Sequence, residues 1–453
     1  MYNPSKVSDA MREFHGDLTA IRRDIHNNPE HAYKETRTAA LVAERLTAYG
    51  VDEVHTGVGR TGVVGVIRGS RPGTRNIGLR ADMDCLAMTE ETRLPYASQN
   101  KGYMHACGHD GHTTMLLGAA RYLAKTRNFS GTVYAVFQPA EEGEAGAKAM
   151  MDDGLFERFP IHAFYGLHNA PWVPLGSMAV RNGAMMAAAD RIEIHIEGKG
   201  GHGGMPQFVS DPVLAAGHVI TAIQSITSRN ADPADSVVVS ICAMEAGVMN
   251  TYNVIPRAVK LIGTVRTYRK EAQKMVIDKL NLIVEHTCAA FGSVGKVTFI
   301  EGYPATINHK REAELSAEVG RSVFGAENVI TEIFPNTGGE DFAFFLQAVP
   351  GAYIWVGQGR EGGFPIHHSC YDFDDRIIPN GAGLLAAIAE KELEWSSTIC
   401  PIRSSANWSR FVAIFMPIQN SGTWRREPRL WSLNGCGLSV LMKCTLVSPR
   451  PGW

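Results

Sequence analysis

The stretch MHACGHDGHTTMLLGAARYLAK (residues 104–125) joins a polar loop to a helical pattern in a chain of 453 residues. Its first half crowds Cys107, three histidines and Asp110 beside two glycines. Its second half carries apolar residues at the spacing of an amphipathic helix. A thiol and several imidazoles this close together are typical either of a polar loop or of half of a metal site. The rest of the chain has to decide between these two interpretations.

Strand-like and helix-like segments alternate on both sides of this stretch. Helical spacing covers residues 15–29 and 35–50, with Gly50 at the usual place of a glycine that ends a helix. Short runs typical of β-strands cover residues 61–69, 76–84, 131–139 and 162–169. The alternation predicts an α/β fold, in which helices cover a sheet.

A second pattern begins near residue 190. Its elements follow the order β-α-β-β-α-β, which is typical of a ferredoxin-like unit. Because the α/β alternation resumes afterwards, we predict an insertion over residues 187–302, between two parts of a catalytic domain at 1–186 and 303–395. Residues 396–453 are rich in Ser, Trp, Arg and Pro and show no clear period, so we expect an atypical, poorly ordered tail.

Composition and charge exclude several classes of protein. The formal net charge is −2, and no basic run is present, so we expect neither nucleic acid nor a membrane surface as a partner. Eight cysteines in so long a chain do not predict a disulfide scaffold. The first residues show no apolar leader, and no stretch is apolar enough to span a bilayer, so we expect a cytoplasmic location.

Polar side chains follow several of the predicted strands. Because sites in α/β sheets form at the carboxyl ends of strands, we expect these side chains to converge. Thiolate, imidazole and carboxylate are ligands that borderline divalent metals accept. The clusters are Asp82 with Asp84, Cys107 with His109, Glu141 with Glu142, His168, and His367 with His368.

A pair of glutamates beside a metal has a natural division of work. One carboxylate would bind the metal, and the other would take a proton from water and return it to the leaving group. Taken alone, however, His168 is more often a hydrogen-bonded core histidine, and a Glu-Glu pair is more often a solvated turn. Cys107 could also be a small buried hydrophobic residue. It could form a nucleophile pair with a histidine, although two residues apart in one loop is poor geometry for such a pair. These alternatives weaken because all five clusters fall in one α/β unit.

Short motifs follow one another along the chain in the order RADMD, MHACGHDGH, FQPAEEG, GLHN, GKGGHGGMP, NVIP, GTVRTY, EDFAFF and PIHHS. In this order they resemble peptidase family M20, and in particular its aminoacylases of the hippurate hydrolase and auxin-conjugate amidohydrolase branch. The resemblance runs from about residue 15 to residue 393. It implies a metallopeptidase-like catalytic domain with a central mixed sheet, and an inserted lid and dimerisation domain.

The resemblance also implies residue roles and a cofactor. Glu141 would be the general base, and Asp84 would orient a ligand histidine. Two divalent metal ions per subunit are expected, zinc or manganese before cobalt or nickel. Their implied ligands are Cys107, His109, Glu142, His168 and His367. His367 is preferred to its neighbour His368 because it follows Pro-Ile, as the ligand of the family does.

Three further residues are candidates for binding substrate. His202 and Asn253 match lid positions that touch the substrate and stabilise the oxyanion, from the same subunit or from its partner. The alternative for His202 is a flexible glycine-rich loop. Arg266 is a candidate clamp for a substrate carboxylate, and equally a charge on the surface of a strand.

The expected reaction is hydrolysis of the amide bond in hippurate-like or N-acetyl amino acids, which yields a carboxylic acid and a free amino acid. A homodimer or homotetramer would form through the lid domain. Departures from the family at Ala87, Gln207 and Ser369 leave the ligand set intact but put the choice of substrate in doubt. The alternatives are a dinuclear metal dipeptidase or carboxypeptidase, an inactive metal-binding protein, and a thiol-dependent hydrolase that uses Cys107.

Overall fold

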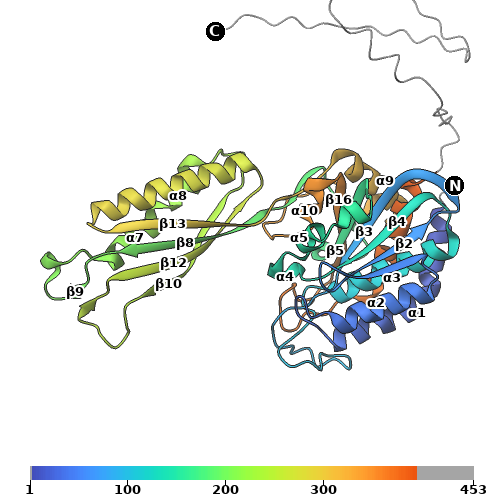
Figure 1. The fold of residues 1–453 in the computed structure, drawn as a ribbon, viewed down its shortest axis with the longest axis horizontal. Helices are drawn as coiled ribbons and strands as arrows, with labels where there is room; N and C mark the ends of the chain where they lie inside the picture. Colours follow the sequence, from blue (N-terminus) through green and yellow to red (C-terminus); the bar gives the residue numbers. More distant parts are fainter. Residues whose placement is uncertain (1–2, 395–453) are drawn as a thin grey trace, which may run out of the picture. The chain divides into compact units, whose positions relative to one another are not determined.

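The computed structural model describes residues 3–394. The expectations for residues 396–453 therefore lie outside the described residues. Within them, the elements form two main sheets (Figure 1).

An eight-stranded mixed sheet organises the first and last parts of the chain. Its spatial order is β1-β2-β4-β3-β5-β16-β6-β15. The four central strands, β4, β3, β5 and β16, run parallel, and antiparallel strands flank them. The mixed sheet of the predicted α/β fold is therefore confirmed. The strands are β1 (Glu53–Val58), β2 (Gly62–Arg68), β3 (Arg71–Asp82), β4 (Ser130–Gln138), β5 (Ala163–Pro174), β6 (Met178–Ala179), β15 (Val329–Ile330) and β16 (Gly351–Gly359).

Helices cover both faces of this sheet, because side chains that alternate along each strand enter different cores. In β4, Val133, Ala135 and Phe137 pack on one side. Tyr134 and Val136 pack on the other side. The first face is covered by α1 (Pro4–Asn27), α2 (Thr36–Ala48), α3 (His109–Thr126), α9 (Lys310–Phe324) and α11 (Ile378–Glu392). The second face is covered by α5 (Gly146–Asp152), α6 (Leu155–Arg158) and α10 (Ala343–Ala348).

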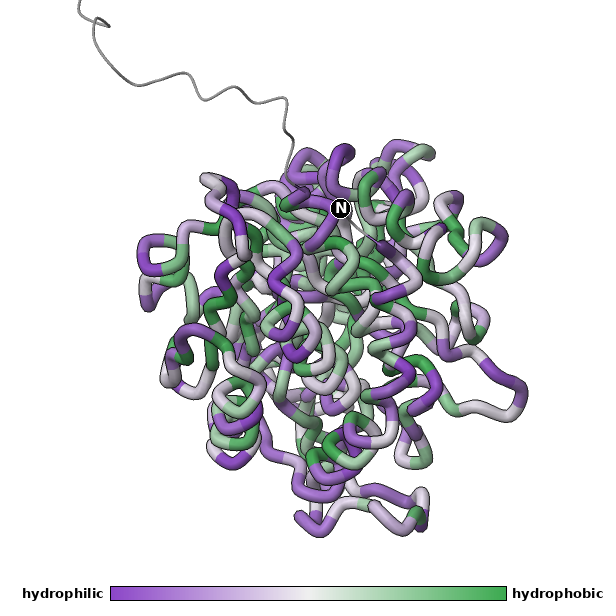
Figure 2. Tube along the Cα trace, turned by 90° about the vertical axis from the view of Figure 1, so that its right-hand side faces the viewer, coloured by the Kyte–Doolittle hydropathy of each residue, from purple (hydrophilic) through white to green (hydrophobic). Residues whose placement is uncertain are grey.

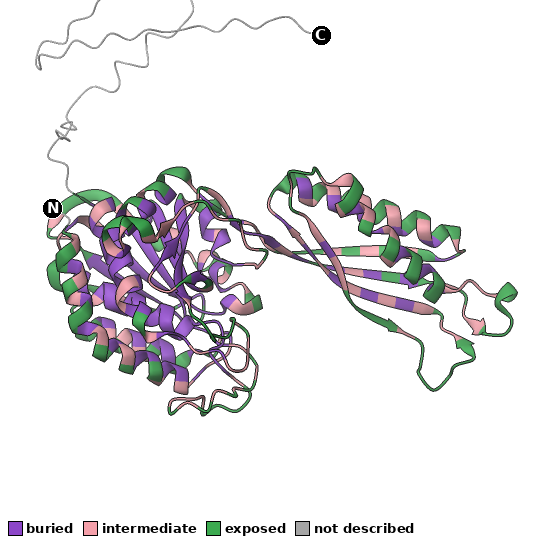
Figure 3. Cartoon of the chain, turned by 180° about the vertical axis from the view of Figure 1, so that it is seen from behind, coloured by how far each residue is buried: buried purple, intermediate pink, exposed green. Residues whose placement is uncertain are grey.

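Burial follows the same division. The strands of the large sheet and the inner faces of its helices carry most of the buried residues (Figure 3). Hydrophilic stretches, drawn in purple, are prominent in the outlying turns of the trace (Figure 2). Burial on both faces explains why these strands read as nearly continuous apolar runs instead of strict alternations.

Residues 188–303 build a separate four-stranded antiparallel sheet of order β10-β12-β8-β13. Isoleucines of β8 pack against α7 and α8, while the alternate residues of the strand are more exposed. The elements are β8 (Ala188–Glu197), α7 (Pro212–Ala222), β10 (Val238–Ala246), β12 (Ala258–Thr267), α8 (Lys270–Ala290) and β13 (Val294–Tyr303). This is the expected βαββαβ order, whereas the division into domains at residues 187 and 302 stays a prediction.

Several boundaries differ from the sequence patterns. Helix α1 begins at Pro4, well before the predicted start at residue 15, because Asn3 caps it through the Lys6 amide. Helix α7 ends at Ala222, and a short π-helix follows at Ile226–Asn230. None of the helices within residues 3–394 is long and apolar enough to cross a membrane.

Candidate metal centre

The candidate site lies at the carboxyl edge of the central strands. Asp82 ends β3, and Gln138 pairs with it at the end of β4, three residues before Glu141. Parallel neighbours end at the same edge, so the loops that follow them meet there. His168 was predicted to follow its strand, but it lies inside β5. The strand continues to Pro174 because β16 pairs with it from Phe164 to that residue.

The opening stretch supplies two donors around a glycine that the backbone requires. Gly108 has φ 101°, and a Cβ at this position would lie 2.1 Å from Oδ1 of Asn169. Only glycine accepts both this conformation and this approach. The turn brings Cys107 and His109, the first residue of α3, to the same side of the sheet edge.

Six side chains from separate parts of the chain converge at this edge. Ligand atoms within each of three overlapping groups lie within 4.8 Å of one another, and each group could hold a metal ion. The groups are Cys107 with His109 and His168, Cys107 with Glu142 and His367, and His109 with Glu141 and Glu142. We call these six residues the donor cluster. Five of them, His109 excepted, line a cavity of about 330 Å³.

Two atoms of the donor cluster are left without a hydrogen bond. Nε2 of His109 and Oε1 of Glu142 are buried and lack a hydrogen-bond partner, although they lie 4.0 Å apart. Nε2 of His367 lies 3.3 Å from the same carboxylate oxygen. Sγ of Cys107 lies 3.3 Å from Nε2 of His168. Buried polar atoms without partners are costly unless something binds them, and this donor set suits a divalent cation.

The pKa values indicate an excess of negative charge. Burial, followed by repulsion from Glu340 and Glu142, raises the pKa of Glu141 well above its usual range. Burial, followed by repulsion from Glu142 and Glu141, raises the pKa of the Cys107 thiol well above its usual range. Burial alone would lower the pKa of His109, but Asp82 and Asp84 outweigh it and raise that pKa to about 10. A bound cation would relieve this repulsion and favour the thiolate and both carboxylates.

Asp84 connects two members of the donor cluster. Its Oδ1 lies 3.2 Å from Nδ1 of His109, and its Oδ2 accepts a hydrogen bond from the Glu142 amide at 2.9 Å. One carboxylate thus contacts His109, which is one of the candidate ligand histidines, and the backbone of Glu142; that Asp84 orients a ligand histidine stays a prediction.

A layer of polar residues behind the donor cluster was not assigned by sequence reasoning. His112 lies 2.6 Å from Oδ1 of Asp82 through Nδ1, and 2.6 Å from Oδ1 of Asn169 through Nε2. Its ring centroid lies 4.4 Å from that of His168. The spacing of His112 three residues after His109 places both on one helix face, and this is the signal that could have identified it.

The EDFAFF motif belongs to the same layer. Arg80 is fully buried and forms ion pairs with Asp82 at 2.7 Å, Glu340 at 3.0 Å and Asp341 at 3.3 Å. The amide of Asp341 lies 3.4 Å from Oε1 of Glu141. The motif therefore supports the segment that carries Glu141 and Glu142, residues 140–145, which we call the glutamate loop. The sequence of the motif alone did not reveal this role.

The candidate substrate residues separate into two places. Arg266, on β12, lines the same cavity as the donor cluster, and its Nε donates to the Thr337 carbonyl at 3.1 Å. His202 on β9 (Gly201–His202) and Asn253, next to β11 (Val254–Ile255), are exposed and do not line that cavity. Within one chain, the structure does not bring them to the donor cluster.

His367 and its rival His368 differ in their contacts. His367 adopts a left-handed backbone, with φ 64°, and contacts Glu142. His368 stacks on Phe364 at 4.4 Å, and its Nδ1 accepts from the Cys370 amide. Among the described residues, His368 belongs to none of the groups that could hold a metal.

An α/β protein with such donors at the edge of its sheet falls in the class of metal-dependent hydrolases. The chain matches peptidase family M20/M25/M40 over residues 78–391. It is 41% identical to hippurate hydrolase of Campylobacter jejuni, over 84% of this chain and 98% of that protein. It is 39% identical to thermostable carboxypeptidase 1 of Saccharolobus solfataricus, over 85% and 98%.

Solved structures agree. A dinuclear metal binding peptidase of the M20 family from Bacillus subtilis superposes with a TM-score of 0.74 at 33% identity, over 84% of this chain and 99% of that one. The chain therefore belongs to peptidase family M20/M25/M40, and the resemblance seen in its motifs is confirmed.

Proposed function

We propose that this chain hydrolyses the amide bond of N-acyl amino acids, such as hippurate or N-acetyl amino acids, and releases a carboxylic acid and a free amino acid. One observation carries the proposal: Glu141 lies beside the ligand candidate Glu142 in a cavity that also contains Arg266. A base, a cation site and a counter-charge for a carboxylate are the parts that this reaction needs. The 41% identity to a hippurate hydrolase supports the same substrate class.

Two divalent cations, zinc or manganese before cobalt or nickel, would be held by the proposed ligands Cys107, His109, Glu142, His168 and His367. When bound, they would polarise the scissile carbonyl and make water a better nucleophile at neutral pH. The unpartnered atoms of His109 and Glu142 support this assignment. The relative from Bacillus subtilis, a dinuclear metal binding peptidase, supports it as well.

Glu141 would act as the general base. Its buried carboxylate would accept a proton from the attacking water and pass it to the leaving nitrogen. The position of this carboxyl, beside Glu142 in the cavity that the donor cluster lines, supports the role. Asp84 would keep the His109 ring and the Glu142 backbone in place.

The remainder of the cavity suggests how a substrate would be oriented. Arg266 has no carboxylate within 4.0 Å among residues 3–394, so its guanidinium is available to a substrate carboxylate. Trp172 and Trp355 line the same cavity, with ring centroids 5.3 Å apart in an edge-to-face arrangement. Such an apolar wall suits a flat aromatic acyl group.

His202 and Asn253 would serve the active site of a partner subunit, in a homodimer or homotetramer formed through the inserted domain. Both are exposed and lie apart from the cavity of their own chain. Large apolar side chains near Asn253, namely Met249 and Tyr252, are 96% and 97% exposed. Apolar surface of this kind supports an interaction surface.

A dinuclear metal carboxypeptidase or dipeptidase is the second candidate. It would use the same ligands and the same Glu141, and would differ in accepting an aminoacyl group. The 39% identity to a carboxypeptidase supports it. Because selectivity of this kind lies in the shape of the pocket, substrate panels have to separate the two activities.

The test is release of free amino acid from hippurate, N-acetyl amino acids and dipeptides. Each would be assayed with the purified enzyme, after chelation, and after zinc or manganese is restored. We expect hydrolysis of the N-acyl substrates that is lost on chelation and recovered with metal. Activity on dipeptides alone would favour the second candidate. Hydrolysis of N-acyl substrates that survives complete metal removal would overturn the metal-dependent mechanism.

A further inference from the structure

The segment that carries Glu141 and Glu142 is conformationally strained. Helix α4 (Glu141–Glu144) is four residues long, and Glu142 and Gly143 inside it have non-helical dihedral angles. Ala140 and Ala145, which flank it, adopt the left-handed region with φ 52° and 55°. L-residues adopt this region at a cost and remain there only where the surroundings hold them. The segment therefore depends on contacts from elsewhere.

Side chains from distant parts of the chain supply those contacts. Each bonds the backbone of the segment directly. The carboxylates are Glu35 to the Ala140 amide at 2.9 Å, Asp84 to the Glu142 amide at 2.9 Å, and Asp341 to the Ala147 amide at 2.8 Å. The phenols are Tyr33, which donates to the Glu144 carbonyl at 2.9 Å, and Tyr303.

Tyr303 makes two of these bonds at once. Its hydroxyl donates to the Glu141 carbonyl at 2.5 Å and accepts from the Ala145 amide at 3.1 Å. It therefore ties the first residue of α4 to the residue that follows the helix. Because Tyr303 ends strand β13, the contact joins the antiparallel sheet to the glutamate loop.

The Glu141 carbonyl and the Glu142 amide belong to one peptide unit. Tyr303 holds the oxygen side of this unit, and Asp84 holds the nitrogen side. An uncompensated change in ψ of Glu141 or in φ of Glu142 would turn this peptide plane and would reorient the two glutamate side chains relative to each other. The two contacts together oppose that rotation.

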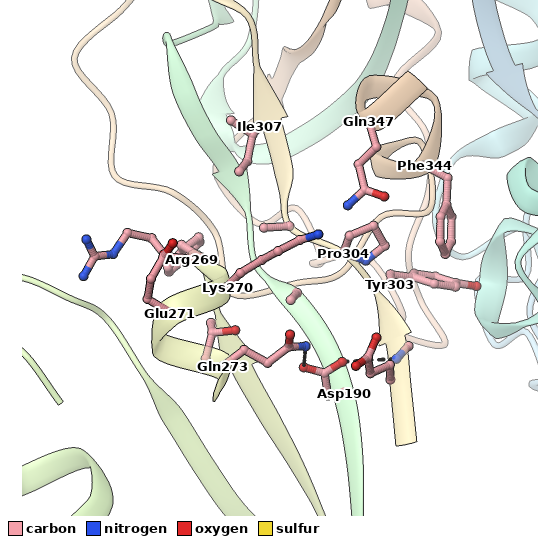
Figure 4. Close-up of a pocket in the computed structure, with 16 residues that line it drawn as sticks. Asp190, Arg269, Lys270, Glu271, Gln273, Tyr303, Pro304, Ile307, Phe344 and Gln347 are labelled. Atoms are coloured by element: carbon pink, nitrogen blue, oxygen red, sulfur yellow. Dashed lines mark hydrogen bonds between the residues drawn. The ribbon is translucent and has the colours of Figure 1, made fainter. Parts of the chain in front are cut away.

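The ring of Tyr303 lies between two hollows. It lines the 330 Å³ cavity of the donor cluster and a second cavity of about 420 Å³ (Figure 4). In the second cavity, its ring packs edge-to-face on Phe344 with a centroid separation of 6.1 Å. The ring is thus anchored independently of the hydroxyl, so removing the hydroxyl alone tests the contact with the loop.

We propose that Tyr303 is a positioning residue for the general base, which sets the orientation of the Glu141–Glu142 peptide and couples it to strand β13. The proposal rests on the proposed function, because it takes Glu141 as the base. Small displacements of a reacting group cost large factors in rate, so the hydroxyl acts on turnover and not on substrate affinity.

The test is Tyr303→Phe, with Tyr33→Phe as the matched control. Each change removes one hydroxyl that bonds the backbone of the same segment. The Tyr33 hydroxyl, however, contacts the Glu144 carbonyl and not the Glu141–Glu142 peptide. For Tyr303→Phe we expect kcat to fall by roughly tenfold or more, with KM, bound metal and melting temperature close to wild type. For Tyr33→Phe we expect kcat within about twofold of wild type on the same principle. Phe344→Leu, which loosens the ring and leaves the hydroxyl, should give an intermediate loss of kcat.

Two results would overturn the proposal. One is an unchanged kcat for Tyr303→Phe. The other is an equal loss of kcat in both phenylalanine variants together with lost metal or lower melting temperature, which would indicate general support of the loop. If Tyr303→Phe does not fold, an unchanged kcat for Phe344→Leu would count against the proposal. Failure of the proposed function is distinct, since the wild type would then release no amino acid or Glu141→Gln would stay active.

Discussion

Two clusters of charged groups each contain one of two adjacent residues of α3, Asp110 and His109. They differ in whether their carboxylates have cationic partners. Around Asp110, each carboxylate has a cationic neighbour: His26 lies 2.8 Å from Asp110, and Arg22 lies 2.6 Å from Asp375. Around His109 lies the donor cluster, in which neither Glu141 nor Glu142 has an Arg or Lys within 4.0 Å among the described residues. We call the first group, Arg22, His26, Glu90, Asp110 and Asp375, the charge-paired cluster.

The pKa shifts of Asp110 and Glu141, one carboxyl from each cluster, run in opposite directions. Burial by itself raises the pKa of every buried carboxyl, including Asp110 and Glu141. At Asp110 the His26 and Arg22 contacts outweigh burial and lower the pKa. At Glu141 neighbouring carboxylates add to burial and raise it. The difference is therefore one of counter-charge: the protein supplies cationic partners to Asp110 and Asp375, whereas no Arg or Lys of residues 3–394 lies within 4.0 Å of Glu141 or Glu142.

The largest expected effect is on catalysis in the donor cluster. Glu141→Gln keeps the shape of the side chain and removes its basicity, so turnover should fall about 10²- to 10⁴-fold, with bound metal retained. The measurement is kcat for hippurate or an N-acetyl amino acid, beside metal analysis of the same sample. Wild-type turnover in this variant would remove Glu141 from the mechanism.

The same substitution sharpens the comparison through stability. Because Glu141 is repelled by its neighbours, Glu141→Gln should raise the melting temperature of the metal-free protein. Asp110→Asn should instead lower stability by about 3–5 kcal/mol, because it removes the buried carboxylate that faces both His26 and Arg22 and leaves them only Glu90 and Asp375. Denaturant unfolding measures both. The control is Asp9→Asn, which breaks an exposed ion pair with Arg12 and should change little. Equal effects of Asp110→Asn and Asp9→Asn would contradict the comparison.

The charge-paired cluster also predicts a pH dependence. Burial would lower the pKa of His26, but hydrogen bonds with Asp110 and Glu90 raise it to about 9. The unfolded value is about 6.5, so protonated His26 contributes stability that is complete below about pH 6.5 and is lost as the pH rises through 9. Unfolding free energies across this window should therefore decline more in wild type than in His26→Gln. Identical slopes would show that His26 is not the titrating group.

The smallest expected effect is that of Asp84→Asn, which weakens a support of the donor cluster without removing a ligand. The amide can still contact His109 but no longer carries the negative charge that polarises its ring. Metal affinity should fall about 10- to 100-fold. Titration with zinc in a competing chelator measures it, and Asp24→Asn, at an exposed ion pair with Arg37, is the control. Unchanged affinity would limit Asp84 to holding the Glu142 backbone.

Much of this architecture could be predicted from local patterns. The amphipathic spacing of residues 112–125 predicted α3, and the βαββαβ order was visible in strand and helix periods alone. The candidate ligands were recognisable because several chemically matched clusters each stood beside a predicted strand. His168 is the instructive exception: its strand continues through Pro174 because β16 pairs with it, with Trp355 opposite His168 at a distance of 187 residues in sequence, and no local pattern reports such a pairing.

The sequence by itself determined the elements, the family and the chemical types of the donors, since these depend on residue identity and short-range spacing. Only the tertiary structure decided which charges are paired. His109 and Asp110 are adjacent in the chain, yet one faces carboxylates and the other faces Arg22 and His26. Likewise, only the fold brings Tyr303 to the Glu141 carbonyl across 162 residues. Electrostatic and hydrogen-bond contacts act over a few ångströms in space, and sequence distance does not measure that separation.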